Sequence, residues 1–80
     1  MLDELKTQRK VVGIKQLRRA LNDDAVKSVF LAENADPQLI DPIAEICAEK
    51  GITLVSVPTM TELGKACGIS VGAAVAGILC

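Results

Sequence analysis

The segment at residues 26–32 (VKSVFLA) constrains the fold of this chain more than any other. It is rich in residues that favour strands, and turn-forming residues bound it. Its centre, Val29-Phe30-Leu31, is continuously apolar, which indicates a strand covered on both faces. The fold must therefore place other elements on each side of the sheet that contains this strand.

Further strands and helices alternate along the rest of the chain. We expect strands at residues 10–12, 52–57 and 73–79. Helices are expected at residues 2–9, at about 14–21, at 42–50, and from Thr59 to a stop at Gly68. This alternation predicts an α/β protein, a three-layer α/β/α sandwich around a small mixed four-stranded sheet, in which residues 1–80 form a single domain.

Two Asp-Pro pairs stand close together before the third of these helices. Asp36-Pro37 and Asp41-Pro42 each combine a capping carboxylate with a proline suited to the first helical position. Because a proline inside a helix removes a hydrogen bond, we expect a single turn at residues 37–40 and a separate helix that begins at Pro42 and ends at Gly51. Thr59 and Glu62 fit the capping-box pattern of the last helix.

The composition excludes several functional classes. Phe30 is the only aromatic residue, and the chain contains no His, Trp or Tyr. Sheets that bind RNA by stacking bases on aromatic rings are therefore excluded. The commonest general base and metal ligand is also missing. Cys47, Cys67 and Cys80 form no C-x-x-C pair, which suits reduced thiols in a cytoplasmic protein better than disulfides or a zinc site.

The common enzyme motifs are absent as well. Gly64-Lys65 lacks the P-loop pattern, since Thr59 and Ala66 stand where glycine and Ser/Thr are required. The C-terminal glycines do not form the dinucleotide-binding pattern. The carboxylates of Asp36 and Asp41 are explained better as helix caps than as catalytic groups. We therefore expect no catalytic residue, no cofactor and no metal. The apolar C-terminal run at residues 69–80 is too short to cross a membrane, and no membrane partner is expected.

The charges of the chain are distributed unevenly. The net charge is −1, but the first 20 residues hold six basic and two acidic residues, a net charge of +4. The remaining residues hold three basic and eight acidic residues, a net charge of −5. A nucleic-acid partner is therefore compatible with the acidic total, because clustering on one face decides such binding. A solvated basic helix in an ordinary acidic protein is the alternative.

The basic cluster falls on a helix that follows Gly13. At 100° per residue, Ile14 and Leu17 gather on one side, while Lys15, Gln16 and Arg19 fall on the opposite side. Arg18 lies at the edge of the apolar stripe. Because a helix N-terminus also has unsatisfied N–H groups and the positive end of its dipole, this surface suits a partner that carries phosphate.

A second segment, at residues 63–76, permits two interpretations. Its small residues are typical of a tightly packed corner between a helix and a strand. If residues 69–72 instead form a loop, Ile69 and Val71 point outward on either side of Ser70, which indicates a binding surface.

Three motifs occur in the order and at the spacing of a known family. They are GIKQLRR (13–19), LAENADP (31–37) and LGKACGISVGAA (63–74). Together they resemble the ribosomal L-seven-Ae family, especially its short bacterial members, over nearly the whole chain. The resemblance implies a module that binds kink-turn RNA, a sharply bent duplex with a three-nucleotide bulge beside sheared G·A pairs.

The resemblance also implies roles for individual residues. Gly13 would allow the backbone to approach RNA, and Lys15 and Gln16 would face purine edges. Arg19 would contact the RNA backbone, and Lys27 would be a further phosphate contact. Ile69, Ser70 and Val71 would form a hydrophobic loop that covers the bulge.

One departure concerns base recognition, because many archaeal and eukaryotic members carry Asn-Glu in place of Lys15-Gln16. Glutamate only accepts hydrogen bonds, whereas lysine donates and prefers guanine O6 and N7, so we expect different base preferences and a stronger dependence on salt. The expected partners are RNA and the ribosome, and the chain is expected to act as a cytoplasmic monomer. The alternative function is a module for protein–protein contact or self-association with the same fold.

Overall fold

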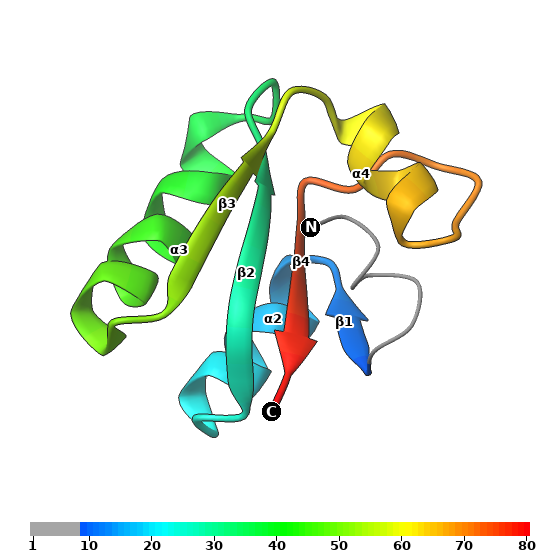
Figure 1. Ribbon diagram of the computed structural model, residues 1–80. Coiled ribbons are helices and arrows are strands. Elements are labelled where there is room, and N and C mark those ends of the chain that lie inside the picture. The colour runs from blue at the N-terminus through cyan, green and yellow to red at the C-terminus, as the bar shows by residue number, and fades with distance from the viewer. Residues whose placement is uncertain (1–8) are drawn as a thin grey trace.

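The computed structural model describes residues 9–80. The helix expected at residues 2–9 lies outside the described residues, apart from Arg9 at its end. In chain order, the elements are β1 (Lys10–Val12), α2 (Ile14–Asn22), β2 (Val26–Ala32), α3 (Pro37–Lys50), β3 (Thr53–Val57), α4 (Met60–Ala66) and β4 (Val75–Leu79) (Figure 1).

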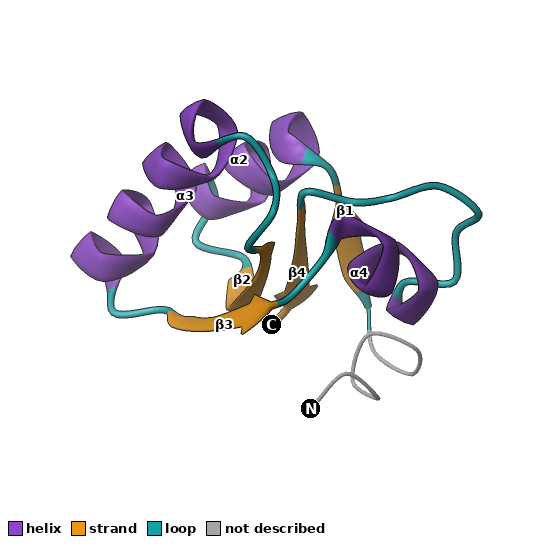
Figure 2. Cartoon of the chain, turned by 90° about the horizontal axis from the view of Figure 1, so that it is seen from above, coloured by secondary structure: helices purple, strands orange, loops and turns teal. Residues whose placement is uncertain are grey.

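The four strands form one mixed sheet in the order β1-β4-β2-β3. Strand β4 runs antiparallel to both of its neighbours, whereas β2 and β3 are parallel. Helices α2 and α3 lie on one face of the sheet, and α4 lies on the other (Figure 2). The predicted three-layer α/β/α sandwich around a mixed four-stranded sheet is confirmed.

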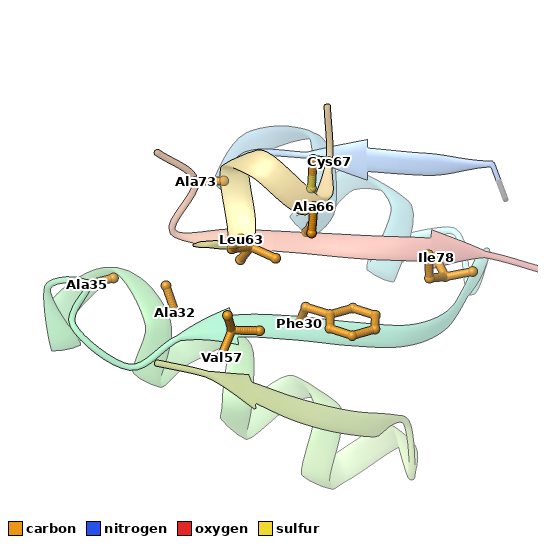
Figure 3. Packing of buried hydrophobic residues seen from close by; sticks show 10 residues of the cluster. Phe30, Ala32, Ala35, Val57, Leu63, Ala66, Cys67, Ala73 and Ile78 are labelled. Carbon is orange, nitrogen blue, oxygen red and sulfur yellow. The ribbon is translucent and has the colours of Figure 1, made fainter. Parts of the chain in front are cut away.

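Strand β2 is covered on both faces, as its continuous apolar run predicts. Val29 and Leu31 pack with Leu17 of α2 and other residues on the face of α2 and α3. Phe30, which is 1% exposed, packs on the opposite face with residues of α4. Figure 3 shows this second cluster, to which β2, β3, β4 and α4 contribute Phe30, Val57, Ile78 and Leu63 respectively.

The expected break before Pro42 is wrong, because α3 is one continuous helix from Pro37 to Lys50. Asp36 caps it by accepting a hydrogen bond from the Gln38 amide at 2.9 Å, as predicted. Pro42 lies on the exposed face of the helix. Since Pro42 has no N–H, the carbonyl of Gln38 loses its helical partner there, but water can satisfy it on this face. A single missing bond is therefore tolerated.

The other predicted helix ends are confirmed, whereas two strands begin later than expected. Gly51 ends α3 in a left-handed conformation (φ 69°), and the Thr59 side chain accepts from the Glu62 amide at 3.1 Å. The Ile52 amide donates to Cys47 at the end of α3, so β3 begins only at Thr53. The loop before β4 likewise extends beyond its predicted end, and β4 begins at Val75 instead of residue 73.

Candidate nucleic-acid interface

Gly13 is the N-cap residue that precedes α2, and its backbone conformation favours glycine. Its φ of 105° lies in the region that side-chain-bearing residues rarely adopt. No side chain caps the helix among the described residues, and its first turn contains no acidic residue. The amides of this turn therefore remain open to an outside acceptor, and a phosphate oxygen suits them best.

The outward surface of α2 carries four polar side chains, which we call the basic face. Its members are all exposed and are Lys15, Gln16, Arg18 and Arg19. The opposite side of the helix is buried in the core through Leu17, Ala20 and Leu21. The periodicity of the sequence placed Arg18 only at the margin of the apolar stripe, but its exposure makes it a third cation of this face.

The cations of the basic face are available to a ligand. Within residues 9–80, the only ion pair joins Lys50 to Asp24, at 2.6 Å. Lys15, Arg18 and Arg19 therefore have no acidic partner among the described residues. Their charges are free to neutralise phosphate groups.

The segment that follows α4 forms a loop that exposes apolar side chains. Ile69 is 36% exposed and Val71 is 68% exposed, and Ser70 between them is exposed too. We call residues 69–71 the apolar loop. Beyond the exposed glycines on either side the chain is packed, since Cys67 and Ala73 are buried. Each interpretation of this segment therefore holds for a different part of it.

The apolar loop begins from a well-defined helix end. The Gly68 amide donates to the Lys65 carbonyl at 3.0 Å, and the Ile69 amide donates to the Gly64 carbonyl at 3.1 Å. These two bonds, with the left-handed Gly68 (φ 80°), form the Schellman motif. The chain therefore leaves α4 in a defined direction at Ile69.

The start of α2 and the segment that follows the apolar loop meet at one end of the sheet. Strand β1 ends beside the beginning of β4, where Val12 pairs with Ala76. The next residue, Gly13, donates its amide to the Val75 carbonyl at 3.2 Å. Figure 2 looks down on this end, with the start of α2 and the loop between α4 and β4 both in view. The fold thus brings two distant parts of the chain to one side.

Asn34 forms a further link between elements of the fold, and the sequence gives no sign of this role. Its side-chain oxygen accepts a hydrogen bond from the Met60 amide at 2.8 Å. The bond joins the β2–α3 connection to the first residue of α4. No local sequence pattern predicts this bond, because Asn34 and Met60 become neighbours only through the tertiary fold.

Lys27 is not brought to this site. It is exposed near the start of β2, where Val26 pairs with Leu79 at the far end of β4. Lys27 lies five positions before Ala32, which corresponds to about 17 Å along β2. Lys27 therefore lies toward the opposite end of the sheet from the start of α2.

The remaining chemical groups offer no catalytic or metal-binding cluster. No group of three or more His, Cys, Asp or Glu gathers within residues 9–80. Cys47 and Cys67 are buried free thiols, and desolvation raises the pKa of each above its ordinary value of 9.0. No helix in the described part of the chain is long and apolar enough to cross a membrane.

Comparison with known proteins points in one direction. The family model of the ribosomal protein L7Ae/L30e/S12e/Gadd45 family matches residues 2–79. A protein of Bacillus pumilus named "RNA-binding protein" is 44% identical over 86% of this chain and 84% of its own length. An RNA-binding protein of Caldanaerobacter subterraneus is 46% identical over 85% of this chain and 83% of its own length.

The fold of this chain is also similar to that of a protein of known structure. The structure titled "Giardia lamblia 15.5kD RNA binding protein" superposes with a TM-score of 0.89 at 26% identity. The alignment covers 99% of this chain and 70% of that one. The similarity therefore extends over the basic face, the apolar loop and the sheet that joins them.

Proposed function

Because this chain belongs to the ribosomal protein L7Ae/L30e/S12e/Gadd45 family, we propose that it is a non-catalytic RNA-binding protein that recognises and stabilises kink-turns in structured RNA. The resemblance described above implies this RNA motif, and relatives named as RNA-binding proteins support the broader function. The RNA would be ribosomal or regulatory. Since one copy of the chain carries both the basic face and the apolar loop, we propose that it binds RNA as a monomer. We propose the cytoplasm as its location.

One observation supports the proposal most strongly, namely the meeting of a basic face and an apolar loop at one end of the sheet. The hydrogen bond from Gly13 to Val75 links the start of the basic face to the segment that follows the loop. A kink-turn presents two matching features, the charged backbone of a bent duplex and unstacked bulge bases. A surface that is cationic on one side and apolar on the other complements both.

The basic face would supply the polar contacts. Lys15 and Gln16 lie in the first turn of α2, where they would reach purine edges, with lysine favouring guanine O6 and N7. Arg18 and Arg19 follow on the same exposed surface and would contact phosphates. Gly13, which bears no side chain, would let the RNA approach the open amides of the helix.

The apolar loop would cover the bulge. Ile69 and Val71 expose hydrocarbon that an unstacked base can bury, and Ser70 between them has a hydroxyl that can donate or accept a hydrogen bond. Burial of apolar surface against a base stabilises the bent form only, because the bases of an extended duplex remain stacked. The protein would therefore shift the RNA population toward the bend.

Lys27 would be a peripheral contact in this arrangement. Lys27 lies near the start of β2, at the opposite end of the sheet from Gly13, so we infer that only a longer RNA stem would reach it. We propose that it contacts the phosphate backbone of such a stem.

Titration of a fluorescently labelled kink-turn RNA tests the proposal. Energy transfer between dyes on the two stems reports bending, and the wild-type chain should produce it at micromolar concentration or below. The double variant Lys15→Ala/Arg19→Ala should bind far more weakly, because it removes two of the cations of the basic face. A duplex of the same composition without the bulge should bind weakly to both proteins.

Lys50→Ala provides the charge control. Lys50 is a cation at the C-terminus of α3, where it pairs with Asp24 and belongs to neither the basic face nor the apolar loop. This variant should bend the RNA as the wild type does. If the wild-type protein leaves the RNA extended, or if the double variant binds as well as wild type, the proposed function is wrong.

A further inference from the structure

The apolar loop is fastened to α4 through main-chain atoms. At its first residue, the Ile69 amide donates to the Gly64 carbonyl at 3.1 Å. Beyond its last residue, the Ala73 amide donates to the Met60 carbonyl at 3.0 Å. Because both acceptors belong to α4, the helix holds the loop on both sides of the exposed residues.

Two glycines allow the helix and the loop to approach this closely. A Cβ atom on Gly64 would overlap with the carbonyl oxygen of Val71 and would lie 3.2 Å from the Cα of Gly72. Because these are main-chain atoms, no change of rotamer can relieve the clash. A Cβ on Gly72 would in turn lie 3.1 Å from the Cβ of Met60. The main chain of α4 at Gly64 therefore packs directly against the main chain of the loop at Val71 and Gly72.

We propose that Gly64 is a positioning residue for RNA binding, because it lets α4 hold the apolar loop in its RNA-binding shape before RNA arrives. This inference rests on the proposed function, since it takes residues 69–71 as an RNA contact. Gly64 is buried in the free chain, so in this proposal it acts through the loop and makes no RNA contact of its own. It lowers the entropic cost of RNA binding, because Ile69 and Val71 are already ordered before the RNA binds.

A matched pair of glycine variants separates positioning from stability. Gly64→Ala should push the loop away from α4. Gly77→Ala places a methyl group 2.6 Å from the Leu17 Cδ1, so it also disturbs packing, but on the face of the sheet that α2 covers. We expect the affinity of Gly64→Ala for kink-turn RNA to fall roughly tenfold or more, since ordering even one residue on binding costs about that much. Because Leu17 belongs to α2, which carries the basic face, Gly77→Ala serves as the control for stability and loop protection, and Gly51→Ala serves as the control for RNA binding.

Amide hydrogen exchange of the free full-length chain gives a readout that needs no RNA. In wild type the amides of Ile69 and Ala73 should be protected, and in Gly77→Ala any faster exchange should affect them and the amides of β2 alike. In Gly64→Ala, both amides should exchange faster, while the amides of β2 stay protected. A variant that merely loses stability would expose all of these amides together.

A second pair covers the case in which Gly64→Ala fails to fold. Gly68 (φ 80°) and Gly51 (φ 69°) both adopt left-handed conformations with no atom within 4 Å of an added Cβ. Alanine should strain each to a similar degree, but only Gly68 directly precedes the apolar loop. Gly68→Ala should therefore weaken RNA binding, and Gly51→Ala should not.

Two results would overturn the inference. One is a folded Gly64→Ala protein that binds kink-turn RNA with wild-type affinity. The other is a wild-type chain whose Ile69 and Ala73 amides are unprotected until RNA is added. Failure of the wild type to bind the RNA at all would overturn the proposed function instead, and the exchange data on the free chain would still show whether the loop is preformed.

Discussion

The amide of Gly13 donates a hydrogen bond to the carbonyl oxygen of Val75 at 3.2 Å. This bond joins the residue that precedes α2 to the first residue of β4. The basic face and the apolar loop are thereby held at fixed positions on one scaffold, as precise recognition of a bent RNA requires.

Replacing the exposed apolar side chains of the loop should weaken RNA binding without unfolding the domain. We expect Val71→Ser to raise the Kd for kink-turn RNA by roughly fivefold to thirtyfold, which corresponds to ~1–2 kcal/mol of lost apolar burial. The melting temperature should hardly change, because Val71 is 68% exposed in the free protein. Leu39→Ser, at a similarly exposed apolar position on α3, is the control and should leave the Kd unchanged.

The salt dependence of RNA binding should distinguish Arg19 of the basic face from the peripheral Lys27. Removing a phosphate contact lowers the magnitude of the slope of log K against log salt by about one unit or less. Arg19→Ala should produce this change with any kink-turn RNA. Lys27→Ala should reduce the slope only when the RNA stem is long enough to reach the start of β2. A change on the short RNA would contradict the position that we assign to Lys27.

Replacing Pro42 should stabilise the protein. Pro42→Ala restores an N–H that can donate to the Gln38 carbonyl inside α3. It also raises the conformational entropy of the unfolded chain, which opposes this gain. The helical gain is the larger effect, so we expect the free energy of unfolding in urea to rise by about 1–2 kcal/mol. Pro58→Ala, at an exposed position between β3 and α4, should not stabilise, and an equal rise there would argue against the missing bond as the cause.

The three thiols should differ in reactivity. Burial raises the pKa of Cys47 and Cys67, so each holds less thiolate at neutral pH than an exposed cysteine does. Iodoacetamide should therefore alkylate the exposed Cys80 first, as mass spectrometry of the native protein can show. Because burial penalises the thiolates and raises the pKa of both groups, the free energy of unfolding should be unaffected by them below pH 9.0 and should fall as the pH rises through the folded-state values. Equal labelling of all three thiols at neutral pH would mean that the core opens readily.

The sequence by itself determined the elements and most of their ends. The apolar run in β2 required cover on both faces, and the caps at Asp36, Gly51 and Thr59 are local features that a short stretch of chain specifies. The periodicity of α2 likewise separated its polar side from its buried side, and the resemblance of three motifs indicated the family.

Only the tertiary structure decided which of the candidate residues share a surface. Whether Pro42 breaks α3 depended on the exposure of that face, and the separation of Lys27 depended on the register between β2 and β4. The contact of Gly64 with Val71 and the bond from Gly13 to Val75 join backbone atoms of different elements. Such contacts leave no periodic pattern in a sequence, because they arise only when helices and strands pack at fixed distances across one sheet.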